Sequence, residues 1–240
     1  DSDVATLKLL SHGPAGSADF VPARIKDSEA KANAAKARFE EDMTKRGVKH
    51  SFEIAEGRAN EVLTLLGRFH DLIVVEQTDR AHDENNWSDA EEAAVRCGRP
   101  TLVVPADRSF ADVGKRIVLA WNGSREAARA LHGALPFIEA AEEVQVLIGP
   151  TREAAPSITK MPETDILAYL RRHAKSVIAR ELSSKDRDAG EDILMAAADS
   201  KADLIVMGAY GRGQVMSFLG LGGATGKVIS SCRVPLLLAH

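Results

Sequence analysis

The sequence predicts an α/β protein that consists of two tandem copies of one parallel-sheet unit. Short runs rich in Val, Ile and Leu alternate with longer helical segments, which is the pattern of βα units that form a helix-covered parallel sheet. The order of elements in the second half recurs in the first half, with one strand and one helix fewer. The composition agrees, because 240 residues with 45% hydrophobic and 28% charged side chains are typical of globular proteins.

The second copy is expected at residues 115–240, where the alternation is clearest. Its strands are expected at residues 116–121, 144–148, 177–182, 203–207 and 236–239. Its helices are expected at residues 125–140, 164–176, 191–202 and 225–231.

The first copy is expected at residues 1–106. Its strands are expected at residues 5–10, 51–55, 72–75 and 101–104, and its helices at residues 28–46, 59–69 and 88–96. The opening strand and helix of the unit are missing. A sheet without this strand would leave the backbone N–H and C=O groups of the neighbouring strands unpaired. We therefore expect the natural protein to have residues upstream of Asp1.

Specific residues support the duplication. Asp71 is followed by Leu-Ile-Val, as Asp203 is 132 residues later. Cys97 and Cys232 each lie three residues before a proline that opens a final apolar strand, and they are 135 residues apart. Between the copies, residues 105–114 have the polar, Pro- and Gly-containing composition of a short surface linker.

The segment after the fourth strand of the second copy is rich in glycine from Gly208 to Gly226. Glycines at the carboxyl end of a parallel strand let the backbone approach a ligand, and a helix starting at residues 223–225 would present free N–H groups to phosphate. The alternative is that these glycines form only a loop and a tight helix start. The Rossmann fingerprint fails at Met216, and the P-loop pattern fails at Leu221 and Val228.

At these residues the chain resembles the universal stress proteins, particularly their tandem form, over nearly its whole length. The resemblance rests on Val-Leu-Ala-Trp-Asn-Gly-Ser at residues 118–124, Asp-Leu-Ile-Val-Met-Gly-Ala-Tyr-Gly at residues 203–211, and the glycine pair before Thr225. It implies flavodoxin-like or Rossmann-like open sheets with strand order 3-2-1-4-5. It also implies that the copies pack as an intramolecular pair, and that a homodimer of such chains is common.

The nucleotide-binding members of this family carry G-x2-G-x9-G-[ST], with an Asp near the adenine at the end of the first strand. Gly208 and Gly211 match, but ten residues separate Gly211 from Gly222, and Gly223 stands at the Ser/Thr position. Thr225 offers a hydroxyl two places on, for capping the helix or reaching a phosphate. Asn122 replaces the Asp and can still donate and accept hydrogen bonds.

The resemblance therefore implies an adenine nucleotide, ATP or AMP, with Mg²⁺ if ATP, in the second copy of a stress-response sensor or regulator. The first copy has acidic residues and no glycine before Gly98 in the equivalent stretch, so we expect it to be empty. We expect no enzyme, or at most slow ATP hydrolysis, because no base, nucleophile or carboxylate pair is evident. The alternative is a nucleotide-free interaction module, and the chain lacks the H-x-G-H and S-G-G-x-D-S loops of adenylyl-transfer enzymes.

Other partners and sites rank lower. A net charge of −4 without a basic stripe argues against nucleic acid, no apolar run is long enough to cross a membrane, and a cytoplasmic location is expected. The histidines show no metal-ligand spacing, and Ser124 is expected to cap a helix rather than act as a nucleophile. Cys97 and Cys232 suit small apolar packing, and residues 215–221 suit either a partner patch or a lid.

Overall fold

The computed structural model describes residues 3–10, 21–77, 89–149, 165–182, 188–211 and 223–240. The chain divides into two compact units, Asp1–Leu65 and Leu66–His240. Helix α2 (Ala59–Gly67) runs across this division.

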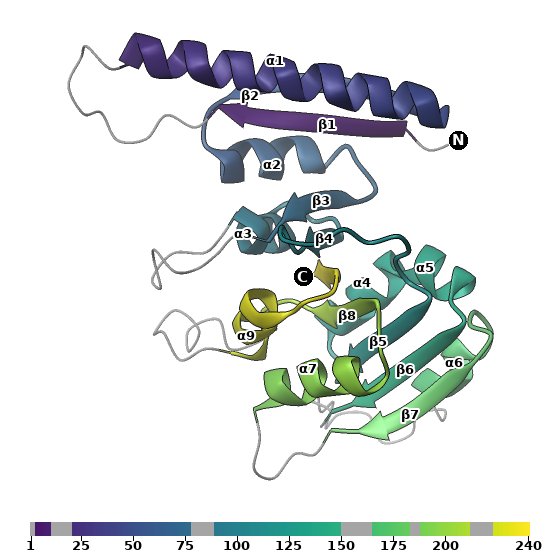
Figure 1. Cartoon of the computed structure of the whole chain (residues 1–240). Helices are drawn as coiled ribbons and strands as arrows, with labels where there is room; N and C mark the ends of the chain where they lie inside the picture. The colour runs from purple at the N-terminus through teal and green to yellow at the C-terminus, as the bar shows by residue number, and fades with distance from the viewer. Residues whose placement is uncertain (1–2, 11–20, 78–88, 150–164, 183–187, 212–222) are drawn as a thin grey trace. The chain divides into compact units, whose positions relative to one another are not determined.

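The first unit is a two-stranded parallel sheet with one long helix against it. Strand β1 (Asp3–Leu10) pairs in parallel with β2 (Lys49–Glu56), and α1 (Val21–Arg46) lies along both (Figure 1). Phe39 of α1 contributes to this packing, since its ring centroid lies 5.7 Å from that of Phe52 and 5.6 Å from that of His50. The helix ends at Gly47, which has the left-handed φ of +66° typical of a glycine after a helix.

The second unit is a seven-stranded sheet in the order β3-β4-β9-β8-β5-β6-β7. The strands are β3 (Ile73–Glu76), β4 (Thr101–Val104), β5 (Arg116–Trp121), β6 (Glu143–Ile148), β7 (Val177–Glu181), β8 (Leu204–Gly208) and β9 (Leu236–Ala239). The helices are α3 (Asp89–Arg96), α4 (Arg125–Gly133), α5 (Leu135–Ala140), α6 (Ile166–Leu170), α7 (Ala189–Asp199) and α9 (Ala224–Ser231).

The strands of residues 115–240 lie in the predicted order 3-2-1-4-5, which corresponds to β7-β6-β5-β8-β9. The α/β fold is therefore confirmed. Two separate open sheets are not what the structure shows: β3 and β4 continue the same sheet, and β4 pairs antiparallel with β9 while the other pairs are parallel. The physical reason is that β4 and β9 are short apolar strands, and pairing their edges satisfies both backbones and buries both sets of side chains.

The register of this antiparallel pair is self-complementary. Leu102 stands opposite Leu237, which is its counterpart 135 residues later in the sequence. Thr101 stands opposite Leu238, and Val103 opposite Leu236, so each flanking pair repeats the other with the copies exchanged. An isologous contact between two copies of one surface has this property.

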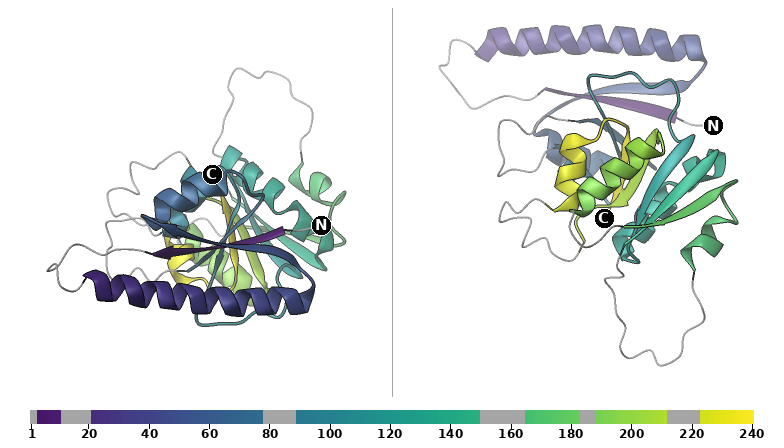
Figure 2. Two further views of the ribbon diagram at one scale, coloured as in Figure 1. Left: turned by 90° about the horizontal axis from the view of Figure 1, so that it is seen from above. Right: turned by 60° about the horizontal axis from the view of Figure 1, so that its bottom comes forward.

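Helices cover both faces of the sheet. One apolar cluster joins residues of α3, α7 and α9 to one face, and α7 lies beside α9 (Figure 2). A second cluster joins α4, α5 and α6 to the opposite face. Strand β5 feeds both clusters, because Val118 belongs to the first and Ile117 and Leu119 to the second. This sandwich fixes the carboxyl ends of β5 and β8, where the predicted site lies.

Two predicted helices differ from the structure. The helix expected at residues 125–140 is two helices, α4 and α5, because Pro136 in the first turn of α5 has no N–H to continue the α4 ladder. The helix expected at residues 164–176 is described only over Ile166–Leu170, capped by the Asp165 carboxylate, which accepts from Leu167 N–H at 2.8 Å. Cys97 and Cys232 are both buried thiols at 3% exposure, as small packing residues would be.

Candidate functional site

The candidate site lies where the strand order reverses. Strand β5 is hydrogen-bonded to β6 on one side and to β8 on the other, so the connections that leave β5 and β8 diverge to opposite sides of the sheet. The carboxyl ends at such a switch point leave a crevice in which open α/β sheets bind ligands. Asn122 directly follows β5, and the Gly208–Gly211 segment closes and follows β8.

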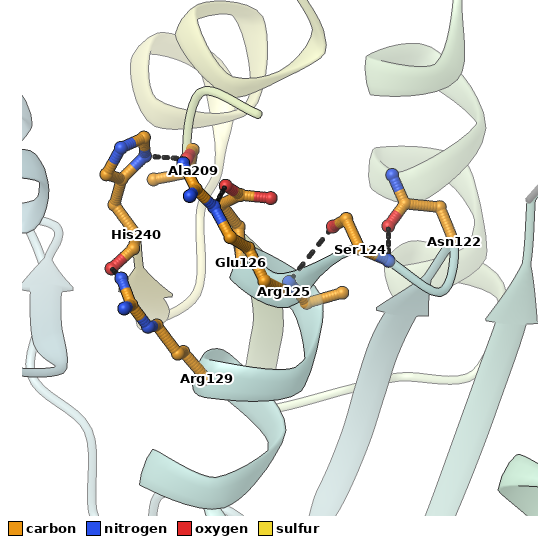
Figure 3. A network of polar contacts seen from close by, with 8 residues as sticks. Asn122, Ser124, Arg125, Glu126, Arg129, Ala209 and His240 are labelled. Atoms are coloured by element: carbon orange, nitrogen blue, oxygen red, sulfur yellow. Dashed lines mark hydrogen bonds and ion pairs between the residues drawn. The ribbon is translucent and has the colours of Figure 1, made fainter. Parts of the chain in front are cut away.

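The turn after β5 aims the start of α4 at this crevice. The Asn122 side-chain oxygen accepts from the Ser124 N–H at 3.1 Å, and Gly123 between them has φ +73° (Figure 3). The Ser124 hydroxyl then accepts from the Ala127 N–H at 3.2 Å and caps α4, as predicted.

Gly208 is a glycine because α4 packs directly against it. A Cβ at this position would lie 2.7 Å from the Ala127 nitrogen and 2.7 Å from the Glu126 carbonyl carbon, closer than any side chain tolerates. The close approach joins the end of β8 to the first turn of α4. This glycine therefore has a packing role whether or not a ligand binds.

The loop beyond Gly208 is closed by Thr225. The Tyr210 N–H donates to the Thr225 hydroxyl at 3.3 Å, and both residues are buried at 7% exposure. Thr225 does not cap α9, because the cap position is Gly223, which supplies no side-chain hydrogen bond. The first N–H groups of α9 thus lack a side-chain cap.

Of the predicted site residues, Gly208, Gly211 and Thr225 lie along this loop, Asn122 ends the adjacent strand, and Gly223 opens α9. Gly222 and residues 215–221 fall outside the described residues.

A carboxylate that sequence patterns did not single out stands beside the glycines. The Glu126 side chain is 3% exposed, and one of its oxygens would lie 3.4 Å from a Cβ on Gly211. Burial raises the pKa of Glu126, but the hydrogen bond from Arg125 at 2.6 Å, a backbone hydrogen bond and the charges of Arg125 and His240 outweigh it. The pKa therefore lies below its ordinary value, and the group is ionised at neutral pH.

Positive groups near the loop are engaged with other partners. His240 Nδ1 lies 2.8 Å from the Ala209 carbonyl, and Arg129 donates to the His240 carbonyl at 2.5 Å (Figure 3). Lys227, in the first turn of α9, forms ion pairs with Glu191 and with Asp188 of the α7 cap, the latter at 3.5 Å. The hydrogen bond with Glu191 is the main reason that the pKa of Lys227 is raised.

Within the described residues, no cluster of three or more His, Cys, Asp or Glu side chains is arranged to hold a metal ion. No helix in the described part of the chain is long and apolar enough to cross a membrane.

The sequence model of the universal stress protein family matches residues 114–240, more than half of the chain. The chain belongs to the universal stress protein family. The Thermus aquaticus universal stress protein in the QAH/OAS sulfhydrylase 3′ region is 33% identical over 152 residues, covering 52% of this chain and 98% of that protein.

Solved structures of family members extend the likeness in fold to the whole chain. A universal stress protein from Archaeoglobus fulgidus superimposes with a TM-score of 0.72 and 17% identity, covering all of this chain and 86% of the other. A putative universal stress protein from Pseudomonas aeruginosa gives a TM-score of 0.52 and 14% identity, covering 99% of this chain and 92% of the other. At these identities the likeness concerns the fold.

Proposed function

We propose that this universal stress protein is a stress-response regulator that binds an adenine nucleotide, ATP or AMP, at the carboxyl ends of β5 and β8. In this proposal residues 1–106 and 115–240 are two copies of the family unit, and the second copy holds the ligand. The binding residues are Asn122, Gly208, Gly211, Gly222, Gly223 and Thr225. Signalling follows from occupancy rather than turnover, so any hydrolysis is slow.

One observation carries the proposal: the glycine motif and the switch point of the sheet coincide. Gly208 and Gly211 follow β8, and β5, which ends at Trp121, is its hydrogen-bonded neighbour. The start of α9 completes the arrangement, since Gly223 leaves the first helical N–H groups without a side-chain cap. Such N–H groups, with the positive end of the helix dipole, favour phosphate.

Asn122 is proposed to face the base. Its side-chain oxygen accepts from the Ser124 N–H, which leaves the amide NH₂ group to serve a ligand. An NH₂ group donates and thus matches the ring nitrogens of adenine, which are acceptors. The Asp of the family pattern would instead accept from the exocyclic amine.

The first test is to purify the protein from cells, denature it and identify any released nucleotide by chromatography. The stripped protein is then titrated with Mg-ATP, AMP and adenosine by calorimetry. We expect one nucleotide per chain, and Asn122→Ala should weaken adenosine and ATP alike by about tenfold, because the contact is to the base. An empty protein that gives no heat of binding contradicts the proposal.

The nucleotide-free interaction module remains the second candidate, and Glu126 is the observation that favours it. A phosphate placed beside Gly211 would meet an ionised, buried carboxylate, and like charges at short range repel strongly where water is excluded. Lys227 is paired with two acidic side chains and does not offset this repulsion in the structure.

Glu126→Gln separates these two candidates. If a phosphate group binds beside Gly211, removing the charge should tighten ATP binding without Mg²⁺ by about tenfold, because a repulsion of this range costs about 1.4 kcal/mol or more. Adenosine affinity should change by less than about twofold, since adenosine carries no phosphate charge. Glu142→Gln is the matched control, because it removes the same charge just before β6, at the amino ends of the strands. Equal changes for ATP and adenosine would place the phosphates elsewhere.

A further inference from the structure

Tyr210 holds a backbone conformation that residues with side chains rarely adopt. Its φ is +46°, in the left-handed region, where the Cβ of a residue other than glycine crowds the following carbonyl oxygen. The residue lies between Gly208 and Gly211, in the loop proposed to approach the nucleotide. Such a conformation persists only where the surrounding structure fixes it.

Three kinds of contact fix Tyr210. Its N–H donates to the Thr225 hydroxyl, and its ring is buried in the apolar cluster that includes Ala90, Ala94 and Val228. Its hydroxyl donates to the carboxylate of Glu91. The phenol thus links the glycine loop to helix α3.

Glu91 is the unusual partner in this set. It is fully buried, at 0% exposure, in the first turn of α3. A buried carboxylate is costly unless hydrogen bonds replace its water, so retaining one here indicates a specific contact. Helix α3 precedes the linker at residues 105–114, so this carboxylate comes from the half of the sequence that lacks the glycine motif.

A second side chain from the same half holds α9. The Gln77 amide, directly after β3, donates to the Ile229 carbonyl at 2.5 Å and to the Cys232 carbonyl at 3.3 Å. Both carbonyls are at the carboxyl-terminal end of α9, whose other end begins after Gly223. The two described parts of the proposed site, the loop after β8 and α9, are therefore both tied to elements that precede the linker.

We propose that Glu91 is a positioning residue for nucleotide binding, and that the half without a glycine motif serves to hold the loop of the other half in its binding conformation. The carboxylate acts through the Tyr210 hydroxyl, which keeps the Tyr210 backbone left-handed and sets the direction of the N–H groups between Gly208 and Gly211. This inference rests on the proposed function, since it concerns the same site.

The test uses the full chain with Glu91→Ala, Glu91→Gln and Tyr210→Phe. Two quantities are measured: ATP affinity by calorimetry, and amide hydrogen exchange at residues 208–211 without nucleotide. Glu91→Ala and Tyr210→Phe should each weaken ATP by about tenfold and speed exchange in the loop by a similar factor. Glu91→Gln keeps an acceptor oxygen for the phenol and should stay within about threefold of the natural protein in both measurements. The double variant should be no worse than either single one, because both remove one contact.

Glu92→Ala is the control, since it truncates the next residue of the same helix turn. If it matches Glu91→Ala in both measurements, or if Glu91→Ala leaves loop exchange unchanged, the positioning role is overturned. A natural protein that binds no nucleotide overturns the proposed function, and the exchange rates then still decide whether Glu91 fixes the Tyr210 loop.

Discussion

Replacing Gly208 by alanine is expected to lower the melting temperature of the protein by about 5–10 °C, from a loss of about 2–3 kcal/mol in unfolding free energy. The added Cβ would lie 2.7 Å from two backbone atoms of α4, the Ala127 nitrogen and the Glu126 carbonyl carbon. Backbone atoms in a capped helix turn cannot rotate away as a side chain would. The strand end and the helix must therefore separate, which opens both apolar faces near β8. Thermal unfolding followed by circular dichroism measures the effect.

Gly211→Ala is the matched control for that substitution. Its Cβ would meet only the end of the flexible Glu126 side chain, at 3.4 Å, and Gly211 does not have a left-handed φ. The melting temperature should change by less than about 2 °C, as for an ordinary surface substitution. If both variants lost the same stability, glycine flexibility rather than the contact with α4 would be the cause.

Asp203→Ala should be comparably destabilising, by about 2–3 kcal/mol. The carboxylate accepts from three consecutive backbone N–H groups, those of Gly114 at 3.2 Å, Lys115 at 3.0 Å and Arg116 at 2.8 Å. These groups lead into β5, so the aspartate fixes where the central strand begins beside β8. Asp203→Asn keeps one acceptor oxygen and should lose about half as much free energy, measured by denaturant unfolding.

Asp71 provides an internal control, because it is the sequence counterpart of Asp203. It is exposed and makes no hydrogen bond or ion pair with the part of the chain that the structure describes. Asp71→Ala should change the unfolding free energy by less than about 0.5 kcal/mol. An equal loss at both positions would show that the three bonds to Asp203 are not responsible.

Much of the fold was predictable from local patterns. The strands at 101–104 and 236–239 have the predicted bounds, because each is an apolar run that opens after a proline and packs fully inside the sheet. The join between β4 and β9 was not predictable, since strand-edge pairing depends on how distant segments meet in space. The break before α5 had a readable signal in Pro136, which a long helical pattern obscured.

The candidate site divides in the same way. Asn122, Gly208, Gly211 and Thr225 follow from motif spacing, and the structure places the last three along one loop at the switch point, next to the strand that Asn122 follows. Glu126 was visible only as a helix residue after Ser124, and nothing in its spacing showed that it faces Gly211. The contact between Glu91 and Tyr210 spans 119 residues and leaves no local pattern.

The pairing of β4 with β9 has a kinetic consequence. Two separate chains that met through their last strands would associate in a second-order step and come apart on dilution. Here the linker at residues 105–114 keeps the two edges on one chain, at an effective concentration on the order of millimolar. The contact therefore forms independently of how much protein the cell contains, and each chain carries its own partner from the moment it is made.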